Sequence, residues 1–319
     1  MFKKWLSIEN HYQELTIEKW LFKHPELENQ DFQITEKIHG ANFSIIAQNG
    51  VIDFASRNGI LDADGSFYSF QEVMKNKELE ELVNFLSDFS LNQPSKVYQL
   101  VGELYGGKIQ KGVWYGKEKN FRWFGLYIDG ELVSQRDADN ILLDFLHLKV
   151  PVIDIVNPPE GLLNFIKNYP TEFKSVLTPE GYEEENICEG VVITPYNNVI
   201  KNQDSYFYIK IKNEKFKEKS SKPKRERSPK EDLPEYITDM ILDLRSYICD
   251  ARKQGLFSKM GELDDRKKLP EFASAYFQDI VEDFEKDTGG KLNSLEKSDR
   301  KIISKSLSKY IFKDLLKSV

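Results

Sequence analysis

The sequence has little cysteine and no long apolar run. Only two of its 319 residues are cysteines, Cys188 and Cys249, and no CxxC motif is present. This scarcity argues against a zinc site or a disulfide framework. The opening residues MFKKWLSIENHYQ lack the apolar segment of a signal peptide, and no stretch approaches the roughly 20 apolar residues needed to span a bilayer. We therefore expect a cytoplasmic protein with no membrane association.

The chain also lacks an excess of positive charge, because 45 basic residues stand against 52 acidic ones and the formal net charge is −7. That total alone argues against a nucleic-acid partner, but the charge is unevenly distributed. Residues 210–230 contain ten basic and three acidic side chains, a net of +7, so the rest of the chain carries −14. A basic segment on an acidic body can bind a polyphosphate backbone. A solvated linker explains the same charges equally well.

Strand patterns dominate residues 1 to about 212. Two runs at 43–47 and 51–55 flank Asn49-Gly50, which predicts a tight hairpin turn. Further strands are expected at 97–104, 122–128, 190–194 and 206–212, with helical patches at about 71–89 and 136–147. We therefore predict an α+β domain rich in antiparallel sheet.

The pattern changes after a Lys-, Ser- and Pro-rich segment at about 213–234, which we interpret as a basic linker. Helical stripes follow, and they are formed by Ile237, Ile241, Leu244, Ile248 and Ala251, by Phe272, Tyr276, Ile280 and Phe284, and by Ile303, Leu307, Ile311 and Leu315. The sequence predicts a first domain over 1–230 and a small all-α domain over 231–319.

A lysine and a later lysine pair are the first candidates for chemistry. Lys37 precedes Gly40 and a probable strand, although most single lysines are solvated surface residues. In the strand at 206–212, Lys210 and Lys212 are two residues apart, so they share one face while Ile211 points into the core. Two like charges side by side require an anion. The pair is either a phosphate clamp or a lysine-protected edge strand.

Carboxylates on apolar strands are the second signal. Glu189 begins the strand at 190–194, and Glu103 lies within the strand at 97–104. A buried carboxylate is costly unless a cation or hydrogen-bond donors accompany it. Arg57 offers a planar bidentate donor for phosphate or carboxylate. Phe124 offers an aromatic face, although an aromatic residue in a strand is more often part of the core.

Taken in order, these motifs resemble those of the covalent nucleotidyltransferases, which include polynucleotide ligases and mRNA capping enzymes. The nucleophile motif KxxG is matched by Lys37 to Gly40, and later motifs by Glu103, Phe124, Glu189-Gly190 and Lys210-x-Lys212. Within this superfamily the chain most resembles the phage-type double-stranded RNA ligases, the RNA ligase 2 family. That resemblance extends from Met1-Phe-Lys-Lys and Glu36-Lys-Ile-His-Gly40 to Ser258-Lys-Met-Gly-Glu262 in the helical tail.

The resemblance implies an ATP-grasp-like adenylation domain and a role for each matching residue. Lys37 would be the nucleophile that carries AMP, Glu103 would hold the ribose, and Phe124 would stack on adenine. Glu189 would help to place Mg²⁺, with Mn²⁺ as an alternative metal. The full set implied to bind nucleotide is Glu36, Ile38, Asn42, Arg57, Glu103, Phe124, Glu189, Lys210 and Lys212, and the set implied to support sealing at the nick is His39, Arg252 and Asp279.

The implied activity is ATP-dependent sealing of 3′-hydroxyl/5′-phosphate nicks in duplex RNA, as in RNA repair, in the host cytoplasm if the chain is phage-encoded. Nicked double-stranded RNA would be the partner, with no obligate protein partner. Two departures stand out: Ala41 replaces the threonine that is frequent in the family, and residues 150–187 match poorly, so no site residue is assigned there.

Three alternatives stay open. A capping guanylyltransferase shares the core motifs, but it would carry a β-barrel after Lys212, where this chain has helical patterns. A DNA ligase is disfavoured for the same reason and by the closer RNA-ligase motifs. A non-catalytic RNA-binding module with the same fold is disfavoured because all of the motif residues are present.

Overall fold

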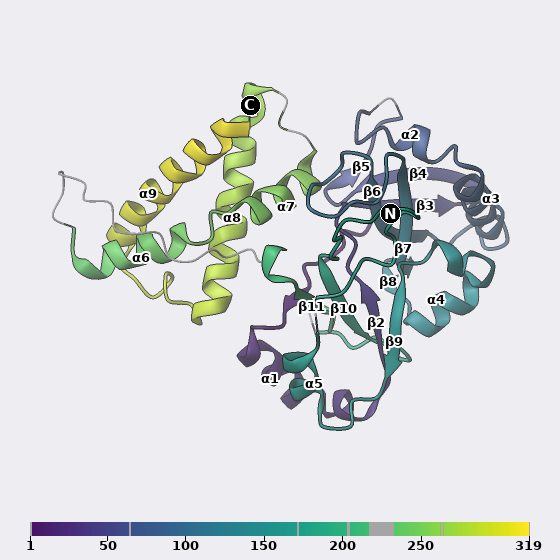
Figure 1. Ribbon diagram of the computed structural model, residues 1–319, viewed down its shortest axis with the longest axis horizontal. Coiled ribbons are helices and arrows are strands. Elements are labelled where there is room, and N and C mark those ends of the chain that lie inside the picture. The colour runs from purple at the N-terminus through teal and green to yellow at the C-terminus, as the bar shows by residue number, and fades with distance from the viewer. Residues whose placement is uncertain are drawn as a thin grey trace. The chain divides into compact units, whose positions relative to one another are not determined.

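The computed structural model describes residues 2–63, 65–170, 172–202, 205–216, 233–261, 263 and 265–318 (Figure 1). The chain divides into two compact units, Met1–Asn213 and Glu214–Val319. The boundary expected at residue 230 and most of the predicted linker at 213–234 lie outside the described residues. The first unit contains two sheets with covering helices, and the second is all-α, which confirms the predicted fold class.

The larger sheet of the first unit is antiparallel throughout and holds the predicted hairpin. Its six strands lie in the order β5-β4-β3-β6-β7-β8. Their bounds are β3 Ala41–Gln48, β4 Val51–Ser56, β5 Gly59–Ile60, β6 Tyr98–Gly106, β7 Lys119–Ile128 and β8 Glu131–Leu132. Asn49 and Gly50 connect β3 to β4 with φ angles of 49° and 76°, which is the left-handed pair that a two-residue hairpin turn requires.

The smaller sheet has five strands in the order β1-β11-β10-β2-β9. Their bounds are β1 Glu9–Asn10, β2 Phe32–Glu36, β9 Val152–Val156, β10 Gly190–Pro195 and β11 Ile209–Lys212. β11 is shorter than the strand expected at 206–212. It pairs with β10 on one side and, in parallel, with β1 on the other. The alternative that Lys210 and Lys212 protect an exposed edge strand is therefore wrong, because β1 covers that edge.

Helices cover the sheets of the first unit. They are α1 Glu14–Lys23, α2 Phe70–Val73, α3 Lys77–Leu91, α4 Gln135–Ile141 and α5 Leu162–Asn168, with 3₁₀ turns at Pro25–Asn29 and Leu143–Leu148. The patch expected at 71–89 is two helices, because Asn76 caps a new helix by accepting a hydrogen bond from the backbone N–H of Glu78. Leu79, Leu82 and Leu86 of α3 are buried in the same cluster as the core of the larger sheet. Figure 1 shows α3 and α4 beside that sheet.

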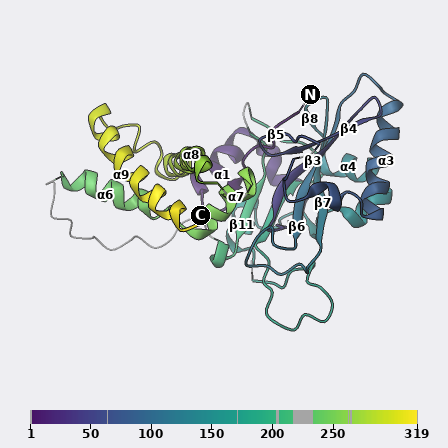
Figure 2. The same ribbon diagram turned by 90° about the horizontal axis from the view of Figure 1, so that it is seen from above.

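In the described part of the second unit, four α-helices pack around one core, and Figure 2 shows them from a second side. They are α6 Glu235–Arg245, α7 Asp250–Met260, α8 Leu269–Thr288 and α9 Lys297–Leu315, with 3₁₀ turns at Glu214–Phe216, Arg266–Lys268 and Leu316–Ser318. The predicted stripes of α8 and α9 are buried as expected. The stripe from Ile237 to Ala251 is divided between α6 and α7, because Cys249 is extended. Within the described residues, no helix combines the length and apolar character needed to cross a membrane.

Candidate active site

Lys37 follows directly after β2, and the pairing of β2 with β10 positions it. Its backbone N–H donates to the carbonyl of Gly190 at 2.9 Å, which continues the contact between the two strands. Its Nζ donates to Oε2 of Glu189 at 2.9 Å. The Lys37 side chain is 21% exposed, so the amine is accessible from one side while it is held by a carboxylate from the neighbouring strand.

Glu189 is the centre of the site. It lies immediately before β10, and its side chain is only 3% exposed. Oε2 receives Lys37 and lies 3.0 Å from Nδ1 of His39, and Oε1 lies 2.9 Å from Nζ of Lys212. Burial alone would raise the pKa of Glu189, but the charges of Lys212, Lys37 and His39 together hold it well below its usual range. Glu189 is therefore a permanent anion at neutral pH.

The strand β11 supplies the lysine pair with the predicted alternation. Ile209 and Ile211 are buried, whereas Lys210 and Lys212 are half-buried on the opposite face. In the pairing with β10, Lys212 lies opposite Gly190 and Lys210 opposite Val192. Lys212 contacts Glu189 directly, so Glu189 is an anion beside the lysine pair.

Two glycines allow the backbones of the site to approach closely. A Cβ on Gly190 would lie 1.9 Å from the carbonyl oxygen of Ile211, and its φ of +149° is one that L residues rarely adopt. A Cβ on Gly40 would lie 2.1 Å from the carbonyl oxygen of Leu104 on β6. Gly40, the glycine of KxxG, therefore allows the chain between Lys37 and β3 to run in close contact with β6.

Glu103 lies on β6, where it is paired in register with Asn42 of β3. The pKa of Glu103 is raised to about 8, mainly by burial and also by the charge of Glu189, against the lowering effects of Lys37, Arg57 and a hydrogen bond from the Gly40 backbone. Glu103 is thus mostly protonated at neutral pH, close to an ionised Glu189. Arg57 also donates from Nη2 to the hydroxyl of Ser7 at 2.9 Å.

Phe124 and Ile38 lie in one apolar cluster beside the nucleophile. Ile38 is buried together with Tyr105 and Val150, and Phe124 packs against this cluster. The Phe124 ring also meets the edge of Trp5, with ring centroids 5.0 Å apart. Phe124 is therefore next to the Lys37 segment. The expected stacking of adenine on its ring stays a prediction.

Ser175 and Tyr115 hold the segment around Lys37 in place, and neither was predicted from the sequence. The Glu36 carboxylate accepts from Oγ of Ser175 at 2.5 Å and from the backbone N–H of Val176 at 2.8 Å, and burial raises its pKa against these two bonds. The backbone N–H of His39 donates to the Tyr115 hydroxyl at 2.9 Å. Ser175 lies in the 150–187 region, and both contacts join residues more than 70 positions apart, so no local pattern indicates them.

Glu189 is the residue of the site best suited to help hold a divalent metal ion. Among the residues that the structure describes, no group of three or more Asp, Glu, His or Cys side chains forms a metal cage. Glu189 is an ionised carboxylate whose oxygens face Lys37 and Lys212. Mg²⁺ commonly binds one or two carboxylates and takes its other ligands from substrate phosphates and water. The residues present fit a metal of that kind, held jointly with a nucleotide.

Arg252 and Asp279 belong to the second unit, where they join α7 to α8. Nη1 of Arg252 donates to Asp279 at 2.5 Å, and Nη2 donates to Asp283 at 2.8 Å. Asp279 also accepts from Nζ of Lys259 at 2.6 Å. The Arg252 side chain is only 1% exposed, so its contacts lie inside the helical unit. The expected role of this pair in sealing stays a prediction.

The fold is shared with a solved RNA ligase structure. The chain superimposes on a mutant RNA ligase of Naegleria gruberi solved with ATP and Mn, with a TM-score of 0.50, 16% identity, and coverage of 68% of this chain and 58% of that one. The mitochondrial RNA-editing ligase 2 of Trypanosoma brucei brucei is 33% identical over 79 residues, which are 23% of this chain and 18% of that protein.

The family assignment comes from two matches that together cover most of the chain. The RNA ligase family model matches residues 30–212. The model of the T4 RNA ligase 2 C-terminal region matches residues 231–313. This chain belongs to the RNA ligase family, which confirms the resemblance drawn from its motifs. It spans little more than half of the Naegleria chain and under a fifth of the trypanosome protein.

Proposed function

We propose that this chain is an ATP-dependent RNA ligase that carries AMP on Lys37 and seals 3′-hydroxyl/5′-phosphate nicks in duplex RNA, as in RNA repair. One observation carries the proposal. The amines of Lys37 and Lys212 lie on the two oxygens of a single buried carboxylate, Glu189. The nucleophile Lys37, the cation Lys212 and the anion Glu189 would thus lie together. The triphosphate of ATP would replace the Glu189 carboxylate as the partner of the two lysines.

The reaction would proceed in three displacements at phosphorus. The neutral amine Nζ of Lys37 bonds to the α-phosphorus of ATP and loses one proton to water, the bond from that phosphorus to the bridging oxygen breaks, and pyrophosphate leaves. An oxygen of the RNA 5′-phosphate then attacks the lysyl-AMP, which breaks the P–N bond and restores the amine. The 3′-hydroxyl finally attacks the RNA 5′-phosphorus, loses its proton and releases AMP.

The neighbours of Lys37 would supply electrostatic stabilisation. A lysine in solution is protonated at neutral pH and must lose a proton before it attacks. Lys210 and Lys212 would hold phosphate oxygens and stabilise the charge that moves onto pyrophosphate. Glu189 would hold a divalent cation together with the phosphates, and that cation would neutralise phosphate charge. Glu103, protonated at neutral pH, would donate a hydrogen bond to the ribose.

Covalent labelling tests the proposal. Protein incubated with Mg²⁺ and ATP radiolabelled at the α-phosphate should retain the label after denaturing electrophoresis, whereas Lys37→Ala should retain none. Lys19→Ala, which removes an exposed lysine of α1, is the matched control and should label like the wild type. A labelled Lys37→Ala protein would refute the assignment of the nucleophile.

Two substrate comparisons extend the same assay. GTP in place of ATP should give no label, and this separates the proposal from a capping guanylyltransferase. Sealing should occur on a nicked RNA duplex and should weaken when the 3′-hydroxyl strand is DNA. A wild-type protein that neither labels nor seals would instead indicate a binding module.

A further inference from the structure

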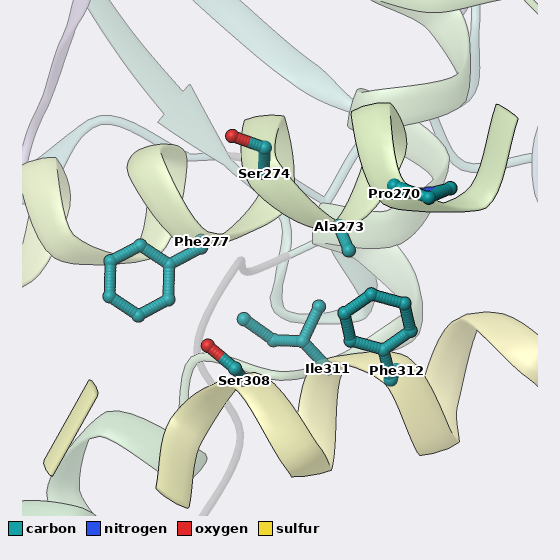
Figure 3. A pocket seen from close by; sticks show the side chains of 7 residues that line it. All are labelled: Pro270, Ala273, Ser274, Phe277, Ser308, Ile311 and Phe312. Carbon is teal, nitrogen blue, oxygen red and sulfur yellow. The ribbon is translucent and has the colours of Figure 1, made fainter. Parts of the chain in front are cut away.

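A groove lies between α8 and α9 in the helical unit, with a volume of about 280 Å³ (Figure 3). Its lining combines apolar and aromatic side chains with the hydroxyl-bearing Ser274 and Ser308. Ala273 and Phe277 of α8 face Ile311 and Phe312 of α9, and Ser308 adds a hydroxyl at one side. Phe312 is 38% exposed, which is unusual for a phenylalanine with a core beside it. An aromatic ring is therefore accessible to a ligand.

A ridge of lysines runs along α9 past this groove. Lys301, Lys305 and Lys309 are all exposed, and they are spaced four residues apart. Successive lysines of the ridge are about 6 Å apart along the helix axis, and each is rotated about 40° around that axis from the one before it. Side chains three residues apart are neighbours on a helix, so Lys305 adjoins Ser308 and Lys309 adjoins Phe312. The rim of the groove on α9 is therefore cationic.

The acidic residues of α9 do not neutralise this ridge. Within Lys297–Leu315, which the structure describes completely, the two carboxylates belong to Asp299 and Asp314. Asp299 accepts from the Tyr236 hydroxyl on α6 at 2.7 Å, and Asp314 lies 3.2 Å from Nζ of Lys253 on α7. Both carboxylates thus contact groups on neighbouring helices rather than the ridge lysines.

We infer that the α8–α9 groove and the lysine ridge bind a single-stranded segment of RNA. A base would enter the groove and stack on Phe312, and the adjoining phosphates would contact Lys305 and Lys309. Aromatic rings beside a cationic track are the combination with which proteins bind single strands without strong sequence preference. The choice of RNA as the ligand rests on the proposed function.

The test measures binding of a short fluorescein-labelled single-stranded RNA by anisotropy at several salt concentrations. Lys305→Ala combined with Lys309→Ala should weaken binding and reduce the slope of log K against log salt by about 1.4, since each phosphate contact on a single strand contributes about 0.7. Phe312→Ala should weaken binding roughly tenfold at every salt concentration and leave the slope unchanged. Phe312→Trp should restore affinity, because it restores a stacking face.

A matched control removes the same charge elsewhere in the unit. Lys291 lies beyond the end of α8 and Lys317 lies in the turn after α9, and both are exposed. Lys291→Ala combined with Lys317→Ala should keep the wild-type salt slope. An equal loss of slope in this control would indicate diffuse attraction by the whole unit and would overturn the inference, as would a wild-type protein that does not bind the strand.

The outcomes separate this inference from the proposed function. If every groove variant labels with ATP and seals nicks, yet binds single-stranded RNA like the wild type, the groove inference fails and the ligase proposal stands. If the variants lose RNA affinity while the wild type forms no adenylate, the groove inference stands alone. If the variants change the sedimentation coefficient rather than RNA binding, the groove holds a second copy of the chain and the inference is wrong.

Discussion

Glu103 and Glu189 are two neighbouring carboxylates whose pKa values are shifted in opposite directions. Burial raises the pKa of Glu103 to about 8, whereas the adjacent lysines and His39 hold the pKa of Glu189 far below normal. One site therefore holds a hydrogen-bond donor and an anion of the same residue type. This division suits a pocket that must bind a neutral sugar and a charged phosphate side by side.

The raised pKa of Glu103 predicts a dependence of stability on pH. Between pH 4.5 and about 8 the unfolded carboxyl is ionised while the folded one keeps its proton, so unfolding releases a proton and the stability contributed by Glu103 falls as pH rises. The slope is at most about 1.4 kcal/mol per pH unit. Glu103→Gln should remove it, so the variant should gain stability over the wild type as pH rises through this window.

Urea unfolding at a series of pH values checks this expectation. The difference in unfolding free energy between Glu103→Gln and the wild type should grow from pH 5 to pH 8 and then level off. Glu80→Gln, on the exposed face of α3, is a suitable control and should show a constant difference. A constant difference for Glu103→Gln as well would mean that the carboxyl ionises normally in the folded protein.

Lys37, Glu189 and Lys212 could be singled out because they fall in separated motifs that resemble those of the nucleotidyltransferases. The structure brings their side chains into contact, and their roles stay predictions. Ser175 and Tyr115 could not be predicted, because a hydroxyl is satisfied by water as readily as by a distant backbone or carboxylate. The direction of the pKa shift of Glu103 also depends on burial that no local pattern encodes.

At the scale of elements, the contact between α7 and α8 includes a buried guanidinium. Arg252 pairs with Asp279 and Asp283, and its Cζ lies 5.5 Å from the centre of the Tyr247 ring. Removing one member of such a network leaves the others charged and poorly solvated. Arg252→Ala should therefore lower the stability of the helical unit by about 3–5 kcal/mol.

Thermal unfolding and nick sealing together test this positioning role. Arg252→Ala should unfold its helices at lower temperature and seal poorly, yet form adenylate on Lys37 normally. Arg266→Ala, which removes an exposed arginine just before α8, should change neither stability nor sealing appreciably. If Arg252→Ala kept full stability but lost sealing, the guanidinium would act at the nick rather than between the helices.

Elements with a turn signal or a helical stripe were predictable, and β2 and β9, which carry neither, were not. The β3–β4 hairpin was indicated by Asn49-Gly50, and the helices α8 and α9 were indicated by their four-residue stripes. β2 is buried at every position and β9 is exposed at nearly every one, so neither shows a two-residue period. The break between α6 and α7 was missed because Ile248 continues the apolar stripe across it.

At the scale of the whole molecule, the two units have separate cores. Each hydrophobic cluster among the described residues draws on one unit alone, and the cluster of the second unit runs from Ile237 to Leu315. Lys37, Glu189 and Lys212 all lie in the first unit. A chain truncated at about residue 230 should therefore fold and form the adenylate, yet lose nick sealing by on the order of 100-fold, about 2.7 kcal/mol of transition-state binding.

Labelling and sealing assays on the truncated chain decide this point. Circular dichroism should first show that the shortened protein keeps its sheet content. Adding pre-adenylated RNA should not restore full sealing, because RNA binding rather than AMP supply is the missing contribution. Sealing at the wild-type rate would show that the helical unit is dispensable for the reaction.

The sharing of Glu189 among Lys37, His39 and Lys212 also has a genetic consequence. One acidic side chain ties the loop after β2 to β11, and Gly190 beside it excludes any bulkier residue. A carboxylate at another position would have to contact Lys37, His39 and Lys212 at the same time, and the close packing at Gly190 leaves no room for its side chain. If the Glu189 codon is mutated and cells are selected for restored function, most survivors should have regained the glutamate codon. Compensating mutations at other positions should be rare.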